Sequence, residues 1–299
     1  MPYDLSKYLV IGISSRALFD LSFENEIYEK EGLEAYCKYQ IEHEDEVLKP
    51  GAGFPLVQAL LKLNEKIPNK RITEVIIMSR NNADTSLRIF NSIDKYGLDI
   101  KRAALTSGVS IAPYLKAFKV DLFLSAFEDD VQEAIDANVP AAMIYSQHHD
   151  YRTDIDEIRI AFDGDAVLFS DEAEKIYQEK GLDAFIEHEK ANAKKPLPEG
   201  PFAKLLRTLS YIQNEVEFEK PPIRTALVTA RNSPAHERVI RTLREWNVRI
   251  DEAFFLGGIS KAEILNAFGA HIFFDDQDVH CSPASNYVPA AKVPYKRTK

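Results

Sequence analysis

The sequence predicts an α/β protein with mainly parallel sheets, built as two tandem lobes. Short apolar segments of strand length alternate with helical patterns throughout the chain, which is typical of parallel sheets with crossover helices. Parts of the first half recur in the second: Gly32–Tyr36 returns as Gly181–Phe185, and Ile41–Glu44 returns as Ile186–Glu189. An offset of about 150 residues indicates a duplicated domain rather than a solenoid repeat.

Two lobes of ordinary domain size account for the 299 residues. We predict a first lobe over residues 1–155 and a second over residues 156–299. Each lobe has an insert of about fifty residues after its first strand, at residues 20–70 and 171–222. The second insert is predicted to form two helices, separated by the proline-rich residues 194–201 that no helix can cross.

The composition is that of a globular protein, with 45% hydrophobic and 28% charged residues. The net charge of −10 leaves no evident basic face, so we expect no nucleic acid polymer as a partner. Cys37 and Cys281 lack metal-ligand spacing and fit a reducing compartment. No signal peptide precedes the first strand, and no apolar run approaches the ~20 residues of a membrane span. We therefore expect a cytoplasmic protein without a membrane partner.

The first strand of the second half carries two carboxylates to its end. Residues 158–162 are apolar enough for a buried strand, and Asp163 and Asp165 follow it in an Asp-Gly-Asp turn. The carboxyl end of a strand is where an α/β sheet places its chemistry. Residues two apart on an extended chain point the same way, so both carboxylates can face one pocket and hold a divalent cation. On its own, however, Asp-x-Asp is a common turn.

Three further segments end in polar side chains in a fixed order. Residues 226–229 form an apolar strand that ends at Thr229, with a helix-opening Asn-Ser-Pro following Arg231. A glycine pair then precedes Lys261 on the first turn of a helix, and the last strand ends in the adjacent carboxylates Asp275 and Asp276. Each segment is ordinary by itself, but the four together in this order are much harder to produce by accident.

This combination resembles the haloacid-dehalogenase-like (HAD-like) phosphatase superfamily, and most closely the cytosolic type I 5'-nucleotidases. The resemblance runs from about residue 8 to about residue 296, through the segments Ser14–Phe19, Phe162–Glu172, His188–Lys190, Leu227–Arg231 and His271–Gln277. It implies two HAD-like Rossmannoid lobes, with each insert forming a short helical cap. It also implies Mg²⁺-dependent hydrolysis of nucleoside 5'-monophosphates, notably AMP, and activation by a nucleotide such as ADP.

The residues predict a two-step hydrolysis. Asp163 is the expected nucleophile, because attack by a carboxylate followed by hydrolysis of the phospho-aspartate avoids a poor direct attack by water. Asp165 would protonate the leaving ribose oxygen and then deprotonate the water. Thr229 and Lys261 would hold the non-bridging phosphate oxygens. Crowded carboxylates require a cation, and we expect Mg²⁺ bound by Asp163, the Asp165 carbonyl and Asp275.

Further residues are predicted around this centre. We place Asp276 beside the metal, where it would orient ligands. Ala230 and Arg231 follow Thr229 and are expected to bind the phosphate with it. Tyr177 and Phe185 on the predicted cap are candidates to stack on the base, although aromatic residues at helical spacing are more commonly part of a core.

The first lobe has lost the catalytic acids. Aligning the halves sets Ser14 and Arg16 opposite Asp163 and Asp165. This lobe is therefore predicted to keep the fold without the catalytic residues, in a structural or regulatory role. In the structural role, it would pack against the catalytic half and help wall the nucleoside pocket.

The regulatory alternative is an anion site. Replacing an acid by arginine changes a metal site into an anion site, because the planar guanidinium suits phosphate. A site of this kind could receive a regulatory nucleotide. The candidate residues in the first lobe are Ser14, Ser15, Arg16, Ser79, Arg80 and Asn81.

Three functions are open at this point. The first is hydrolysis of nucleoside 5'-monophosphates, with AMP-like substrates preferred. The second uses the same residues on another small phosphomonoester, since the cap sets the substrate. The third is a nucleotide-binding regulatory protein with incidental hydrolysis, against which the intact catalytic set argues. The preferred base and sugar are not determined by the sequence, and a homo-oligomer is compatible with it.

Overall fold

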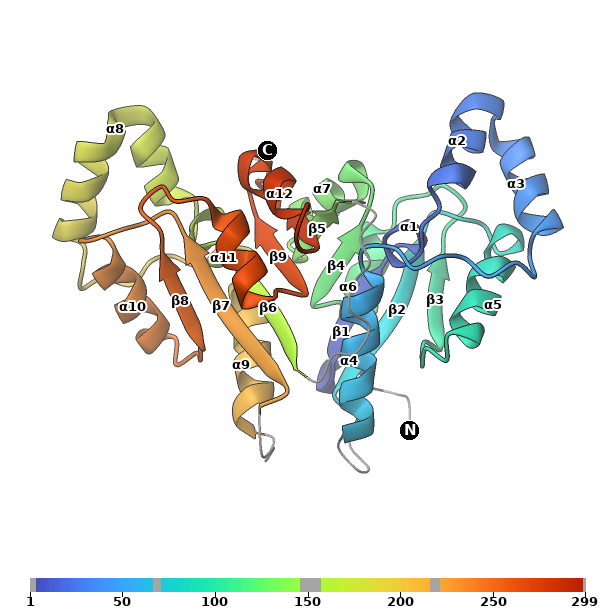
Figure 1. The fold of residues 1–299 in the computed structure, drawn as a ribbon, viewed down its shortest axis with the longest axis horizontal. Coiled ribbons are helices and arrows are strands. Elements are labelled where there is room, and N and C mark those ends of the chain that lie inside the picture. Colours follow the sequence, from blue (N-terminus) through green and yellow to red (C-terminus); the bar gives the residue numbers. More distant parts are fainter. Residues whose placement is uncertain (1–3, 67–70, 146–156, 216–220, 298–299) are drawn as a thin grey trace. The chain divides into compact units, whose positions relative to one another are not determined.

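The computed structural model of the protein describes residues 4–66, 71–145, 157–215 and 221–297. The chain divides into two compact units, Met1–Asp154 and Ile155–Arg297, and each contains a sheet with flanking helices (Figure 1). The strand pairs described within each unit are parallel, which confirms the predicted α/β class with mainly parallel sheets. The predicted lobe boundary at residues 155 and 156 lies outside the described residues.

The sheet of the first unit has the strand order β3-β2-β1-β4-β5. Its strands are β1 (Leu9–Ile13), β2 (Thr73–Ser79), β3 (Arg102–Leu105), β4 (Leu122–Ser125) and β5 (Ala141–Ile144). Every residue of β1, β2 and β4 is buried. Continuous burial is expected for parallel strands that helices cover on both faces.

The helices of the first unit follow its strands. They are α1 (Ser15–Leu18), α2 (Ser22–Glu31), α3 (Leu33–Glu42), α4 (Phe54–Lys66), α5 (Leu87–Lys95), α6 (Ala112–Ala117) and α7 (Glu128–Asp136), with short 3-10 turns at Leu5–Lys7 and Asp84–Ser86. Helix α4 packs against β2, and α7 packs against β4 and β5. The pair α2 and α3 forms a hairpin that stands beyond the carboxyl ends of the strands (Figure 1).

The second unit repeats this sheet, with the order β8-β7-β6-β9-β10. Its strands are β6 (Ile158–Phe162), β7 (Ile223–Thr229), β8 (Glu252–Phe255), β9 (Ile272–Asp275) and β10 (Ala290–Lys292). In both units, the first strand in the chain lies at the centre of the sheet, between the second and the fourth. Residues that follow the central strand therefore have a neighbouring strand end on each side.

The helices of the second unit are α8 (Glu172–Ala191), α9 (Ala203–Glu215), α10 (His236–Glu245), α11 (Lys261–Phe268) and α12 (Asp278–Ala284), with a π-helical turn at Gly164–Leu168. Helix α10 begins just after the Asn-Ser-Pro segment that the sequence indicated as a helix start. The amide of His236, its first residue, donates to the Asn232 carbonyl. No helix among the described residues is long and apolar enough to cross a membrane.

The helical inserts of the two units bend at equivalent glycines. Gly32 between α2 and α3 has φ of 87°, and Gly181 within α8 has φ of 80°, a conformation that glycine adopts without steric cost. Gln40 and Glu189 lie at the same distance from these glycines, and each accepts from an arginine of the helix after the next strand. The alignment of Ile41–Glu44 with Ile186–Glu189 was therefore wrong, because it does not keep the spacing from the bend.

Candidate active site

Three of the predicted site residues lie at the carboxyl ends of adjacent strands. Asp163 follows β6, Thr229 ends β7 and Asp275 ends β9, in a sheet where β6 lies between the other two. The backbone amide of Asp163 donates to the carbonyl of Phe274 at 2.8 Å, which continues the β6–β9 ladder up to the carboxylate. Parallel strands expose their carboxyl ends at one edge of the sheet, and this brings the three side chains together.

Lys261 joins two of these carboxylates. It is the first residue of α11, and its side chain is 3% exposed. Its Nζ donates to Oδ1 of Asp163 at 2.5 Å and to Oδ2 of Asp275 at 2.6 Å. Helix α11 packs against β7, so the ammonium group enters the site from the helix that follows the Gly257–Gly258 turn.

Burial and crowding dominate the electrostatics of this centre. Burial raises the pKa of Asp163 well above its ordinary value, and Asp275, Asp165 and Asp276 act in the same direction against Lys261. Burial by itself lowers the pKa of Lys261, but Asp163 and Asp275 outweigh it and the net pKa is raised. The lysine therefore stays an ammonium, and two carboxylates share its single positive charge.

Asp276, the second carboxylate at the end of β9, is also buried. Its Oδ2 accepts a short hydrogen bond from the hydroxyl of Tyr295. Burial is the main reason that the pKa of Asp276 rises to about 7; Asp275 adds to the rise, and the Tyr295 hydrogen bond opposes it. The sequence offered no signal for Tyr295, because nothing in its local segment distinguishes it from other aromatic residues near the end of the chain.

The donor set of this centre fits Mg²⁺. When all three are ionised, Asp163, Asp275 and Asp276 carry three negative charges against the one positive charge of Lys261, and a divalent cation would balance the excess. In the part of the chain that the structure describes, no three His, Cys, Asp or Glu side chains form a metal-holding group by themselves. Mg²⁺ does not need one, since one or two carboxylates usually hold it together with phosphate and water oxygens.

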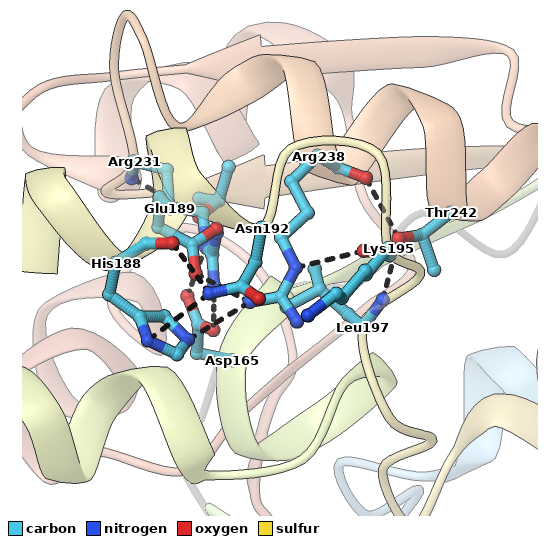
Figure 2. Close-up of polar contacts among 10 residues, drawn as sticks. Asp165, His188, Glu189, Asn192, Lys195, Leu197, Arg231, Arg238 and Thr242 are labelled. Carbon is cyan, nitrogen blue, oxygen red and sulfur yellow. Dashed lines mark hydrogen bonds and ion pairs between the residues drawn. The ribbon is translucent and has the colours of Figure 1, made fainter.

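Asp165 faces an arginine. Both of its carboxylate oxygens accept from Arg231, from Nη2 to Oδ1 and from Nε to Oδ2, each at 2.7 Å (Figure 2). A bidentate pair of this kind fixes both partners in one geometry. Arg231 was predicted to bind phosphate, and in this structure its guanidinium is held by the carboxylate that was predicted to act as the acid and base.

Glu189, on helix α8 of the insert, binds the same arginine and a second one. Its Oε2 accepts from Nη1 of Arg231 at 2.5 Å, and its Oε1 accepts from Nη1 of Arg238 at 2.8 Å (Figure 2). The Glu189 side chain is 0% exposed, and those of Arg231 and Arg238 are 3% and 5% exposed. Burial acts to lower the pKa of Arg231, but Asp165 and Glu189 outweigh it and raise it. Two carboxylates and two guanidiniums therefore neutralise one another in a buried series of ion pairs, Asp165–Arg231–Glu189–Arg238.

Further hydrogen bonds hold Arg238, the last member of this series of ion pairs. Arg238 donates from Nε to the carbonyl of Lys195 at 3.0 Å, and Nε2 of His188 lies 3.3 Å from its Nη1. Thr242 donates to the carbonyl of Arg238 and accepts from the amide of Leu197. These contacts join α8, the loop after it and α10 (Figure 2).

The sequence motifs did not point to Glu189 or Arg238. A signal was present for Glu189: the first half has glutamine at position 40, opposite Glu189, and asparagine at position 81, opposite Arg231. Glu189 and Arg231 thus appear together in the half that keeps Asp165.

The candidate base-stacking residues have different surroundings. The rings of Tyr177 and Phe185 meet edge to face, with centroids 6.4 Å apart, and Tyr177 is 48% exposed. The guanidinium carbon of Arg231 lies 5.3 Å from the centroid of the Phe185 ring, which places this ring beside the buried ion pairs of Arg231. Phe202, also on the insert, is fully buried against Phe274 and belongs to the core.

Thr229 keeps a local role at the end of β7. Its Oγ1 accepts from the amide of Arg231 at 3.2 Å, which shapes the turn that contains the exposed Ala230. A β-carbon built on Gly164 would lie 3.4 Å from the same Oγ1. The hydroxyl therefore adjoins the backbone between Asp163 and Asp165.

The six residues of the predicted anion site line one cavity of about 610 Å³ in the first unit. Ser14, Ser15 and Arg16 follow β1, and Ser79, Arg80 and Asn81 follow β2. They occupy the positions that Asp163–Asp165 and Thr229–Arg231 occupy in the second unit.

Comparison with known proteins finds similar sequences. The family model described as 5'-nucleotidase matches residues 1–299. The human protein named cytosolic 5'-nucleotidase 1B is 40% identical over 286 residues, which cover 92% of this chain and 47% of that protein. The chain thus spans about half the length of the curated relative that it matches. The match confirms the resemblance inferred from the motifs.

Proposed function

Because this chain belongs to the 5'-nucleotidase family, we propose that it hydrolyses nucleoside 5'-monophosphates, AMP-like ones preferred, to a nucleoside and phosphate. The observation that supports this most is the contact of Lys261 with both Asp163 and Asp275 at one sheet edge. It joins the proposed nucleophile, the proposed phosphate-binding cation and a proposed metal ligand within one buried centre. The similar human protein is named as a cytosolic 5'-nucleotidase.

In the first step, a carboxylate oxygen of Asp163 attacks the phosphorus atom, and the bond from phosphorus to the ribose 5'-oxygen breaks. Lys261 and the Thr229 hydroxyl donate to the non-bridging oxygens and stabilise the charge that develops there. The product is a phospho-aspartate and a free nucleoside. In the second step, water attacks this phosphorus atom, and Asp163 is regenerated with release of phosphate.

Asp165 handles the protons in both steps. It donates a proton to the leaving 5'-oxygen and then takes one from the attacking water. Both of its oxygens accept from Arg231 in this structure, so one of them has to be released before it can donate. We propose that Arg231 turns part of its guanidinium to the substrate phosphate, while Glu189 continues to hold the other part.

Mg²⁺ is the proposed cofactor. Asp163, the Asp165 carbonyl and Asp275 would hold it, with Asp276 beside it. When bound, it would supply positive charge to the phosphate oxygens. The cap residues Tyr177 and Phe185 are proposed to contact the base.

Phosphate release from a panel of substrates tests the proposal. With Mg²⁺, the wild-type protein is expected to release phosphate from purine and pyrimidine 5'-monophosphates faster than from sugar phosphates, with AMP among the best substrates. EDTA should abolish release and added Mg²⁺ restore it, because the carboxylate excess needs a divalent cation. Faster release from sugar phosphates would favour the other phosphomonoesterase function. Tight nucleotide binding without turnover would favour a regulatory binding protein.

Activation is a separate proposal. We expect ADP, which the family resemblance suggests as an activator, to raise the initial rate of phosphate release from AMP at subsaturating AMP. Unchanged rates over a range of ADP concentrations would contradict it. A cytoplasmic location, which the relative's name suggests, and self-association are further proposals, to be tested by cell fractionation and light scattering.

A further inference from the structure

The cavity of the first unit is not used by the proposed reaction. Its volume of about 610 Å³ is within the range of roughly 300–1,000 Å³ that is typical of small-molecule sites. It lies at the carboxyl ends of β1 and β2, and its lining includes Tyr28, Leu33 and Tyr36 from the α2–α3 hairpin. Tyr28 and Tyr36 meet edge to face with centroids 6.1 Å apart, as Tyr177 and Phe185 do in the second unit.

The floor of this cavity has the backbone geometry of the catalytic centre. The amide of Ser14 donates to the carbonyl of Leu124 at 2.9 Å, as Asp163 does to Phe274. The amide of Asn81 donates to Oγ of Ser79 at 3.2 Å, the same contact that Arg231 makes with Thr229. Ser79 thus keeps the strand-end hydroxyl that the second unit is proposed to use for phosphate.

The groups for metal binding and nucleophilic attack are absent from these positions. Ser14 replaces the nucleophile, Ser125 stands at the position of Asp275, and the fully buried Ile111 stands at that of Lys261. A phosphate ester bound here would meet serine hydroxyls in place of the carboxylate nucleophile and the metal ligands.

Arg16 supplies positive charge to this site. Its Nη1 donates to the Asn25 side chain at 2.8 Å, and its guanidinium lies 5.0 Å from the centroid of the Phe127 ring. No ion pair joins it to a carboxylate among the described residues, and burial lowers its pKa against the opposing effect of Glu29 and Asp20. An anion in the cavity would compensate this half-buried cation.

The other arginine of the cavity is already neutralised. Arg80 contacts Asp130 at 2.5 Å and Glu133 at 3.4 Å. Asp130 therefore does not offer an uncompensated charge against an anion, and the remaining acids of the lining, Glu128 and Asp129, are exposed.

Asn81 adds an unsatisfied donor. Its Oδ1 accepts from the hydroxyl of Tyr36 at 3.4 Å, while its Nδ2 is buried and has no hydrogen-bond partner among the described residues. A buried amide donor without a partner is unfavourable. Since Asn81 lines the cavity, an acceptor oxygen of a ligand would satisfy it.

We propose that this cavity binds the phosphate group of a nucleotide-sized phosphate ester without a metal and without hydrolysing it. Arg16 and the hydroxyls of Ser15 and Ser79, which lie 3.1 Å apart, would contact the phosphate, and Tyr28 and Tyr36 the organic group. The proposal rests on the proposed function only for the class of ligand, a nucleoside monophosphate.

Isothermal titration of the full chain with AMP, and separately with inorganic phosphate, both in EDTA, tests this site. AMP is expected to bind the wild-type protein, and Arg16→Ala to weaken binding by about ten-fold or more, the loss typical of a charged hydrogen bond. Ser79→Ala should weaken it in the same direction. Lys30→Ala, which removes an exposed charge of the first unit, should leave it unchanged. Thr229→Val, the matched change in the second unit, should not remove the component of binding that Arg16→Ala weakens.

Absence of metal-free binding to the wild-type protein would overturn the proposal. Equal affinity in Arg16→Ala and Ser79→Ala would do so as well, as would loss of binding in Thr229→Val alone, which would assign the phosphate to the second unit. Phosphate release from AMP with Mg²⁺ is measured on the same preparations. Its absence from the wild-type protein would contradict the proposed nucleotidase and leave the binding result standing.

Discussion

Asp163→Asn is expected to lower phosphate release from AMP by on the order of 10³-fold or more, because the amide cannot form the phospho-enzyme. The substitution keeps the size of the side chain and leaves Lys261 its contact with Asp275. We therefore expect the variant to remain folded. Steady-state phosphate release with Mg²⁺ measures the loss, and acid-quenched reactions with labelled substrate should show a covalent phosphate on the wild-type protein alone.

Asp183→Asn is a matched control for this change. Asp183 is an exposed residue of α8, so the control removes one negative charge from the same unit without touching the centre. Its rate should equal that of the wild-type protein. If Asp163→Asn were to keep more than about a tenth of the wild-type rate, Asp163 could not be the nucleophile.

Glu189→Gln is expected to destabilise the protein by about 3 kcal/mol, because removing one member of a buried ionic chain leaves a charge uncompensated. Arg231 keeps Asp165, whereas Arg238 loses its carboxylate. For a unit of this size, such a loss lowers the Tm by roughly 6–12 °C. Thermal unfolding followed by circular dichroism measures it, and the folded variant should also turn over AMP more slowly, since Arg231 loses the group that positions it.

Glu179→Gln is the matched control, an exposed glutamate of the same helix, and its Tm should not change. In the double variant Glu189→Gln/Arg238→Gln, the destabilisation should be smaller than the sum of the two single effects, because both unbalanced charges are removed together. Additive effects would show that Glu189 and Arg238 do not act as a pair.

Much of the fold was predictable because strand patterns depend on local apolarity. The strands that end at Phe162, Thr229 and Asp275 were located within a residue or two, and their parallel pairing follows from the helices between them. The bend at Gly181 was not predicted, because a single glycine in a helical pattern gives no sign of whether it bends or continues the helix.

The sequence by itself determined which residues stand at strand ends and helix starts, and with them the candidate nucleophile, the candidate phosphate-binding lysine and the replaced acids of the first half. These are properties of position along the chain. Only the tertiary structure decided the partners. Contacts such as Lys261 to Asp163 or Glu189 to Arg231 join residues 42 to 98 positions apart, and such pairs form because the fold brings helix residues to the strand ends of the sheet. Burial then decides their energetic weight, because a charge has to be compensated where water cannot reach it.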